Sequence, residues 1–215
     1  MKATDCETRA RLVRAASQLF GRHGFKKVTV RQICRAARAN VASVNYHFGD
    51  KTGLYREVLR LAIDTMVETS RTAQAAGHGL APEERLRRYI DVWMRRVAEP
   101  SASGWIHGLL QRELADPTPA FDIAALVNRG IRPRVEVLLA IVAEILGSTP
   151  SDTRVIRCVA SIHAQWIFYL PNPISTRLQS GFHVDSRNID QVVEHIAAFS
   201  LAGIRAVAGL PEGTG

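Results

Sequence analysis

Cysteine is scarce in this chain of 215 residues, which limits the kinds of site that it can hold. Cys6, Cys34 and Cys158 are odd in number and far apart, and no Cys-x-x-Cys pair occurs. A disulfide framework needs paired cysteines, and a structural zinc site needs closely spaced ones. We therefore expect neither disulfides nor a metal site, and reduced thiols fit a cytoplasmic protein.

Long apolar segments are also missing. The most apolar stretch, VEVLLAIVAEILG at residues 135–147, contains Glu136 and Glu144. It is shorter than the ~20 residues that a membrane-spanning helix needs. The N-terminal segment MKATDCETRARLVRAAS carries charges where a signal peptide has an apolar region. The sequence therefore predicts no membrane span and a cytoplasmic location.

Negative charge is scarce at the N-terminal end of the chain. Residues 1–60 contain 13 Lys and Arg against 4 Asp and Glu, a net charge of +9, whereas residues 61–215 contain 15 against 16, a net charge of −1. A basic segment attached to a neutral remainder is typical of proteins that bind a polyanion, either nucleic acid or an anionic membrane surface. A basic face that only keeps the protein soluble is the alternative.

The alternating apolar and polar pattern of β-strands is absent, and apolar residues recur instead at helical spacing. We therefore expect an all-α protein. Pro133 should break or kink the helix in which it lies, because proline removes a hydrogen-bond donor and clashes with the preceding turn. The predicted helices cover residues 7–23, 30–37, 41–47, 51–76, 82–98, 104–115, 119–147, 152–169 and 188–209.

Two short helices near the N-terminus are marked by capping residues. Thr29, followed three residues later by Gln32, is a capping-box pattern that opens the helix at 30–37. Asn40 is a favoured N-cap for the helix at 41–47. Two short helices joined by roughly four residues are typical of a helix-turn-helix unit.

The second of these helices is rich in hydrogen-bonding side chains. In a helix-turn-helix unit the second helix enters the major groove, so its outward positions need groups that donate to and accept from base edges and phosphates. Val44 and Phe48 would instead anchor the helix on the first one. The outward side chains that suit this task are Ser43, Asn45, Tyr46 and His47. An ordinary solvated face is the alternative.

The segment TVRQICRAARANVASVNYHFGDKTGLY resembles the DNA-binding head of the TetR family of transcriptional repressors. The segments GWIHGLLQRELADPTPAFD, IRPRVEVLLAIVAEILG and HIAAFSLAGIRAV are similar to the body of its CecR-like subgroup. The resemblance implies a three-helix helix-turn-helix head at residues 1–50. It also implies a long fourth helix that joins this head to a helical ligand-binding and dimerisation body at residues 51–215.

The resemblance also implies which residues contact double-stranded operator DNA. Those on or beside the DNA would be Thr29, Arg31, Asn40, Ser43, Asn45, Tyr46, His47 and Lys51. Lys51 has independent support, because a cation in the first turn of a helix opposes the helix dipole and makes sense where a phosphate binds. Asn45 stands where the family often has an aromatic residue, so the bases that are read stay open.

The predicted body places aromatic rings and isolated polar groups in its helices. Such a set suits a mostly apolar pocket with a few orienting groups. The candidate pocket residues are Trp93, Trp105, His107, Gln111, Arg112, Phe121, His163, Trp166 and Tyr169. The alternative is that they are ordinary core residues of a constitutive or architectural DNA-binding protein without an effector. The resemblance favours a repressor that responds to a small-molecule effector.

Two further expectations concern assembly and catalysis. The family pairs its last two long helices with their symmetry mates, which implies a homodimer on a palindromic operator; intramolecular packing of the same apolar residues is the alternative. The chain has no His-x-x-x-His pair, no Gly-rich phosphate loop and no Gly-x-Ser-x-Gly motif. We therefore expect no catalytic residues and no cofactor.

Overall fold

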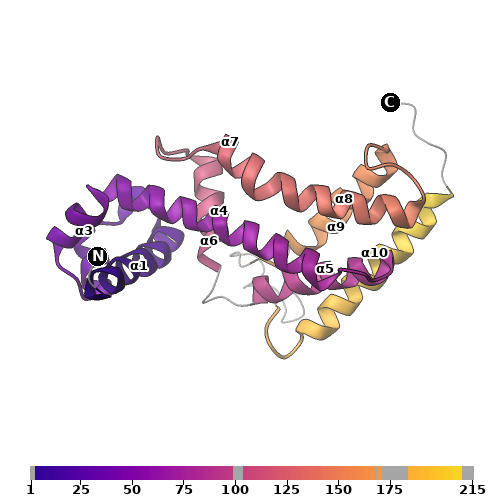
Figure 1. Cartoon of the computed structure of the whole chain (residues 1–215), viewed down its shortest axis with the longest axis horizontal. Coiled ribbons are helices and arrows are strands. Elements are labelled where there is room, and N and C mark those ends of the chain that lie inside the picture. Colours follow the sequence, from indigo (N-terminus) through magenta and orange to yellow (C-terminus); the bar gives the residue numbers. More distant parts are fainter. Residues whose placement is uncertain (1–2, 99–103, 168, 171–183, 210–215) are drawn as a thin grey trace. The chain divides into compact units, whose positions relative to one another are not determined.

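The structure, a computed structural model, describes residues 3–98, 104–167, 169–170 and 184–209 (Figure 1). Within those ranges all regular structure is helical, as the sequence predicts. The elements are α1 (Ala3–Lys27), α2 (Val30–Ala37), α3 (Val41–Phe48), α4 (Lys51–Ala76), α5 (Pro82–Ala98), α6 (Gly104–Ala115), α7 (Ile123–Ala125), the π-helix η1 (Leu126–Ile131), α8 (Arg132–Leu146), α9 (Thr153–Ile167) and α10 (Ile189–Ala208).

The predicted caps of the two short helices are formed. Thr29 Oγ1 accepts a hydrogen bond from the backbone N–H of Gln32 at 3.3 Å, and Thr29 N–H donates to Gln32 Oε1 at 2.8 Å. The Asn40 side chain accepts from the backbone N–H of Ala42 at 3.0 Å. Because these caps satisfy backbone donors that a helix end leaves unpaired, α2 and α3 begin where the sequence predicts.

Gly24 interrupts the first helix, where the sequence predicts an end. Its backbone adopts φ 77° and ψ 165°, a conformation that glycine reaches without a steric penalty, and a short helical turn follows to Lys27. The chain therefore changes direction at Gly24 before α2 begins.

The predicted helix at 119–147 is divided in the structure. Asp122 accepts a hydrogen bond from the Ala125 N–H at 2.9 Å, so helix begins only at Ile123. The chain then passes through η1, and α8 starts at Arg132 with Pro133 in its first turn. No gap separates η1 from α8, so where the sequence predicts a break or kink at Pro133 the helix is irregular rather than interrupted, and the first turn of α8 tolerates the missing donor.

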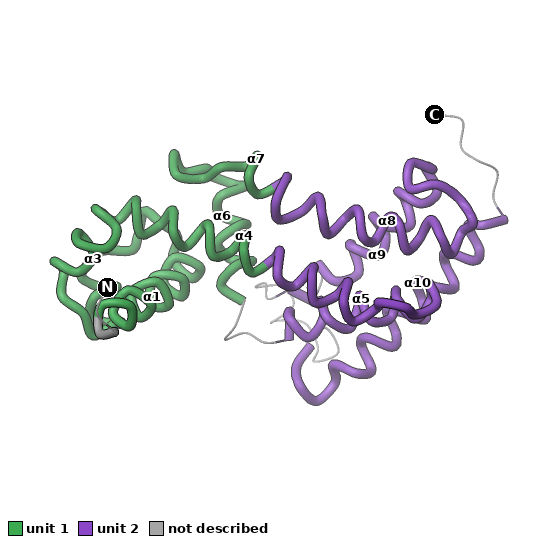
Figure 2. The backbone as a smooth tube through the Cα atoms, in the orientation of Figure 1, with its two compact units in different colours: residues 1–65, 100–126 green, residues 66–99, 127–215 purple. Residues whose placement is uncertain are grey.

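The chain forms two compact units (Figure 2). Unit 1 comprises residues 1–65 and 100–126, and unit 2 comprises residues 66–99 and 127–215. This division differs from the boundary predicted at residue 50, because α6 packs with α1 in unit 1. Residues of α4 belong to both units, with the change at residue 65.

Each unit has its own apolar core. In unit 1, α1, α2, α3, α4 and α6 contribute fully buried side chains that include Leu12, Phe20, Ile33, Val44, Leu54 and Leu109. In unit 2, α5, α8, α9 and α10 contribute Leu86, Ile90, Met94, Leu138, Val155 and Ile196. Among the helices that the structure describes, none combines the length and apolar character needed to cross a membrane.

Candidate nucleic-acid interface

Helix α3 presents one apolar face to the core of unit 1 and one polar face to solvent. Val44 is fully buried, whereas Asn45 is exposed and Tyr46 is 76% exposed. Ser43 is half-buried. The exposed side chains can donate and accept hydrogen bonds outside the protein, which is what contact with base edges requires.

His47 is placed differently from its neighbours on α3. Its Nε2 atom lies 3.3 Å from the Asp5 carboxylate on α1, and its side chain is only 5% exposed. The ring therefore docks α3 against α1 and leaves little surface for DNA. The DNA contact predicted for His47 stays a prediction.

Thr29, Arg31 and Asn40 are all exposed, but two of them already have partners. Thr29 and Asn40 cap α2 and α3 through their side-chain oxygens. Their caps fix the ends of the two helices, so any contact with DNA would come from a side chain that is already oriented.

Lys51 begins α4 and lies above an aromatic ring of α1. Its Nζ is 4.2 Å from the centroid of Phe25, and burial lowers its pKa. The Lys51 ammonium group therefore has a favourable contact with an aromatic ring within unit 1, whether or not a phosphate also binds it. Asp50 accepts from the Gly53 N–H at 2.6 Å and caps the same helix end.

Gly53 fixes the corner between α3 and α4. A Cβ atom at this position would lie 1.9 Å from the carbonyl oxygen of Phe48, the last residue of α3. Only glycine allows this approach without a shift of the backbone. The close contact determines where α3 ends relative to the first turn of α4 within unit 1.

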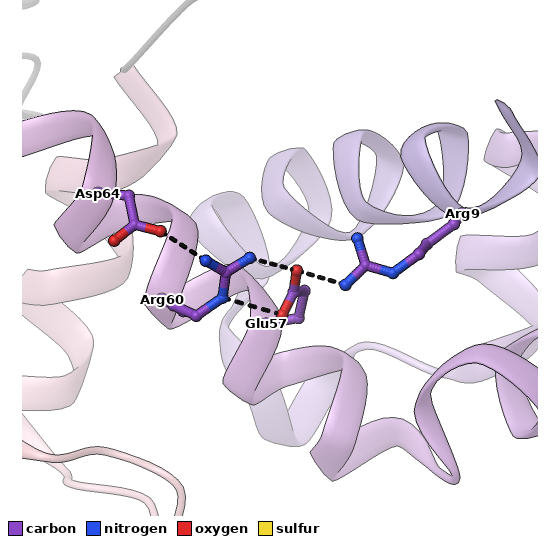
Figure 3. A network of polar contacts seen from close by, with 4 residues as sticks. All are labelled: Arg9, Glu57, Arg60 and Asp64. Carbon is purple, nitrogen blue, oxygen red and sulfur yellow. Dashed lines mark hydrogen bonds and ion pairs between the residues drawn. The ribbon is translucent and has the colours of Figure 1, made fainter. Parts of the chain in front are cut away.

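A charged network ties α4 to α1 within unit 1 (Figure 3). Glu57 accepts hydrogen bonds from Arg60 at 2.7 Å and from Arg9 at 2.5 Å, and Arg60 also donates to Asp64 at 2.7 Å. The bonds from Arg60 and Arg9 lower the pKa of Glu57 to about 2, so this carboxylate stays ionised at neutral pH.

Five of the predicted ligand-contacting residues lie in unit 1. Trp105 is 8% exposed in the core of that unit, and Phe121 packs against the same core. Arg112 donates to the backbone carbonyls of Gly21 at 3.1 Å and Arg22 at 2.7 Å. His107 is half-buried, and burial lowers its pKa, whereas Gln111 is exposed. The structure therefore gives Trp105 and Arg112 a packing role between α6 and α1.

Glu113 was not singled out from the sequence, although it is 1% exposed. Its carboxylate accepts from the Tyr55 hydroxyl and from the Thr118 N–H, the latter at 2.8 Å. These bonds join α4 to α6 inside unit 1. The only sequence signal is an acidic residue between apolar positions of one helix.

The other four predicted ligand-contacting residues lie in unit 2, and three of them meet in one cluster. The ring centroids of Trp93 and Trp166 are 6.0 Å apart, and His163 stacks on Trp166 at 4.9 Å. Tyr169 is half-buried beside the same core. Tyr89 and Arg134, which the sequence analysis missed, join them: Tyr89 is 5.9 Å from Trp166, and Arg134 lies over Trp93.

We call Tyr89, Trp93, Arg134, His163 and Trp166 the indole cluster. It combines three aromatic rings with a guanidinium and an imidazole, drawn from α5, α8 and α9. In the part of the chain that the structure describes, no three His, Cys, Asp or Glu side chains are grouped as a metal site would require.

Comparison with known families matches two parts of the chain. Residues 12–58 match the family "Bacterial regulatory proteins, tetR family". Residues 82–204 match "HTH-type transcriptional dual regulator CecR, C-terminal domain". The first match covers α2 and α3 with parts of α1 and α4, and the second begins at α5 and ends within α10.

Two curated relatives are named as a transcriptional regulator and an operon repressor. The "HTH-type transcriptional regulatory protein RaaS" of Mycobacterium tuberculosis is 43% identical over 124 residues, 54% of this chain and 56% of that protein. The "Probable acrEF/envCD operon repressor" of Escherichia coli K12 is 30% identical over 98 residues, 46% of this chain and 44% of that protein. The matches thus span about half the length of these relatives.

Solved structures share the fold over nearly the whole chain. The TetR family transcriptional regulator PfmR from Thermus thermophilus has a TM-score of 0.61 at 20% identity, covering 91% of this chain and 97% of that chain. A TetR-like transcriptional regulator from a Rhodococcus species has a TM-score of 0.59 at 17% identity, covering 94% and 97%. At these identities the likeness concerns the fold alone.

Proposed function

Because the chain belongs to the TetR family of transcriptional regulators, we propose that it is a repressor that binds a palindromic operator as a homodimer and is released by a small molecule. Like its relatives, it is a DNA-binding transcriptional regulator rather than an enzyme. The operator, the dimer, the effector and a cytoplasmic location are part of this proposal.

The observation that carries the DNA-binding proposal is the exposed face of α3. Asn45 and Tyr46 face solvent while Val44 anchors the helix, and the first 60 residues have a net charge of +9. Positively charged side chains are attracted to DNA and contact its phosphates. Exposed polar side chains on a helix can form hydrogen bonds with base edges.

Selection of binding sites from random DNA tests this proposal. We expect a palindrome whose half-site centres lie about one helical turn apart, ~34–36 Å, or slightly more if the heads are splayed. With roughly eight phosphates neutralised per dimer, the logarithm of the binding constant should fall against the logarithm of salt concentration with a slope of about −7. An affinity that does not depend on salt, or the recovery of no palindrome, would rule out specific operator binding.

Dimerisation through α9 and α10 is supported by the apolar side chains that these helices leave uncovered. Ile156 is 49% exposed, Ile167 is 59% exposed and Phe199 is 63% exposed. A second copy of the chain would cover them in a twofold interface. Ile156→Asp and Phe199→Asp should therefore yield monomers in sedimentation experiments, whereas Leu114→Asp, a change at an apolar residue of α6 that is 57% exposed, should leave the dimer intact.

Effector response is supported by the indole cluster in unit 2 and by α4, whose residues belong to both units. A ligand shifts an equilibrium only by its difference in affinity for two states, and operator DNA must then weaken ligand binding by the same factor, typically ~5–150-fold. Titrating a ligand with and without operator measures that factor. Equal affinities would favour the second candidate, a constitutive or architectural DNA-binding protein whose buried aromatic residues are ordinary core residues.

A further inference from the structure

Arg134 contributes a positive charge to the indole cluster, and among the described residues no carboxylate is paired with it. Its guanidinium carbon lies 5.0 Å from the centroid of the Trp93 ring, and burial lowers its pKa. Over the described residues its Nε has no hydrogen-bond partner, and no carboxylate forms an ion pair with it. Arg134 is half-buried, so its charge is only partly solvated and would be stabilised by an anion bound beside it.

The two indole rings add further unpaired donors. Trp93 is 7% exposed and Trp166 is 5% exposed, and among the residues that the structure describes the Nε1 atoms of both lack an acceptor. Buried indole N–H groups usually have a hydrogen-bond partner, because an unpaired buried donor costs about 1–3 kcal/mol. The rings meet edge to face at 6.0 Å, so two donors from different helices belong to one cluster.

His163 supplies an acceptor in the same place. Its Nδ1 lies 3.0 Å from the Val159 carbonyl, which can only accept, so Nδ1 carries the hydrogen and Nε2 has the lone pair. Within the described part of the chain Nε2 has no partner. Burial, together with the nearby Arg134 charge, lowers the pKa of His163 to about 4, so the ring is neutral at pH 7.

These groups define the complementary ligand. Three donors, one of them a guanidinium, favour an anion, and a planar fork of N–H groups matches a carboxylate. The acceptor on His163 favours a neighbouring hydroxyl group, and the aromatic rings favour a flat apolar framework. We infer that the indole cluster is the effector site of the repressor and that it binds a small aromatic monocarboxylate carrying a hydroxyl group. The inference rests on the proposed effector response, and Arg134 is the residue that selects the anion.

Three matched probes test the ligand class. Calorimetry with 3-hydroxy-2-naphthoate, its carboxamide and 2-naphthoate separates the charge from the hydroxyl group. We expect the acid to bind, the carboxamide to bind about 10–100-fold more weakly because the charge-assisted bond is lost, and 2-naphthoate to bind about 2–10-fold more weakly. If none of the three binds at millimolar concentration, or if the carboxamide binds as well as the acid, the inference fails.

Substitutions on α8 test whether the charge of Arg134 causes the preference for the acid over the carboxamide. Arg134→Met should reduce the affinity for the acid to that for the carboxamide and leave carboxamide binding unchanged, and Arg134→Lys should recover only part of the preference. Arg132→Met is the control, because Arg132 is exposed on the same helix. A preference for the acid that survives in folded Arg134→Met would overturn the assignment.

The three tryptophans give a measurement that needs no destabilising substitution. In the ¹⁵N-labelled wild-type protein, the acid should shift the indole N–H signals of Trp93 and Trp166 and leave that of Trp105, which packs in the core of unit 1. A shift of the Trp105 signal alone would place binding elsewhere and contradict the inference.

The outcome for this site can be told apart from the outcome for the function. If the acid binds through Arg134 but operator affinity stays the same, the site is correct and the effector response fails. If another compound releases the operator while the three probes do not bind, the function is retained and the inference about the indole cluster is wrong.

Discussion

Tyr55 donates its hydroxyl hydrogen to the carboxylate of Glu113, and both side chains lie in the core of unit 1 with 1% of their surface exposed. Burial and the adjacent carboxylate raise the pKa of Tyr55, so the phenol stays protonated and remains a donor. The same carboxylate accepts from the Thr118 backbone, so helices α4 and α6 are joined by one fully paired polar group.

Removing this hydroxyl should destabilise the protein. Tyr55→Phe leaves the buried carboxylate with one donor fewer, and we expect the free energy of unfolding to fall by about 1–3 kcal/mol. Tyr46→Phe is the matched control, because the same atom is removed from a side chain that is 76% exposed. Urea denaturation of both variants measures the difference, and equal effects would contradict the pairing of Tyr55 with Glu113.

The crossing of α1 and α6 permits no side chain at Gly108. A Cβ atom there would lie 2.5 Å from the backbone oxygen of Gly21. Because alanine is favoured over glycine in a helix by ~1 kcal/mol, helix propensity alone would make the Gly108→Ala variant more stable than the wild type. We expect instead that Gly108→Ala lowers the free energy of unfolding by about 1–3 kcal/mol through overpacking. Gln111→Ala, at an exposed position of α6, should change it by less than ~0.5 kcal/mol. Thermal unfolding that shows Gly108→Ala to be stabilised would exclude the close crossing.

The depressed pKa of His163 makes part of the stability depend on pH. The unfolded imidazole takes up a proton near its ordinary pKa of 6.5, whereas the folded one does so only near pH 4. The contribution of neutral His163 to the free energy of unfolding is therefore complete above pH 6.5. It declines by about 3 kcal/mol in all as the pH falls toward 4. His163→Phe should lose this component. If wild type and variant lose the same stability between pH 7 and pH 4, His163 titrates normally.

The residue proposed to read bases and the residue proposed to contact phosphates should respond differently to truncation. Asn45→Ala should cost ~1–3 kcal/mol of binding free energy mainly at one base-pair position. Lys51→Ala should weaken all sites about equally and make the salt slope shallower by about one unit. Binding to a panel of single-base operator variants at several salt concentrations distinguishes the two. Unchanged base preferences in Asn45→Ala would leave it without a reading role.

The sequence predicts best those features that depend on neighbours along the chain. The capping pair Thr29 and Gln32 and the N-cap Asn40 set the start of α2 and α3, and Pro133 marks the beginning of α8, because each acts within one or two turns. The all-α fold and the helix-turn-helix unit follow from such local patterns, whereas the family follows from a resemblance of whole segments.

Features that depend on distant segments could not be predicted. Trp105 belongs to the core of unit 1 because Gly21 and Gly108 let α6 approach α1, and two glycines 87 positions apart give no local signal. Arg134 meets Trp93 and Trp166 only once α5, α8 and α9 have packed. A set of aromatic residues chosen from helical spacing therefore mixed members of two different cores.

The membership of α6 in unit 1 has a consequence for exchanging parts between related regulators. A hybrid that joins residues 1–50 to a foreign body would separate Phe25 from Tyr55, whose rings are 4.7 Å apart, and from Glu113, the hydrogen-bond partner of Tyr55. Transplanting residues 1–65 together with 104–126 keeps both the ring contact and the buried carboxylate. DNA specificity in this fold is thus a transferable module only when it is carried by two separate stretches of chain.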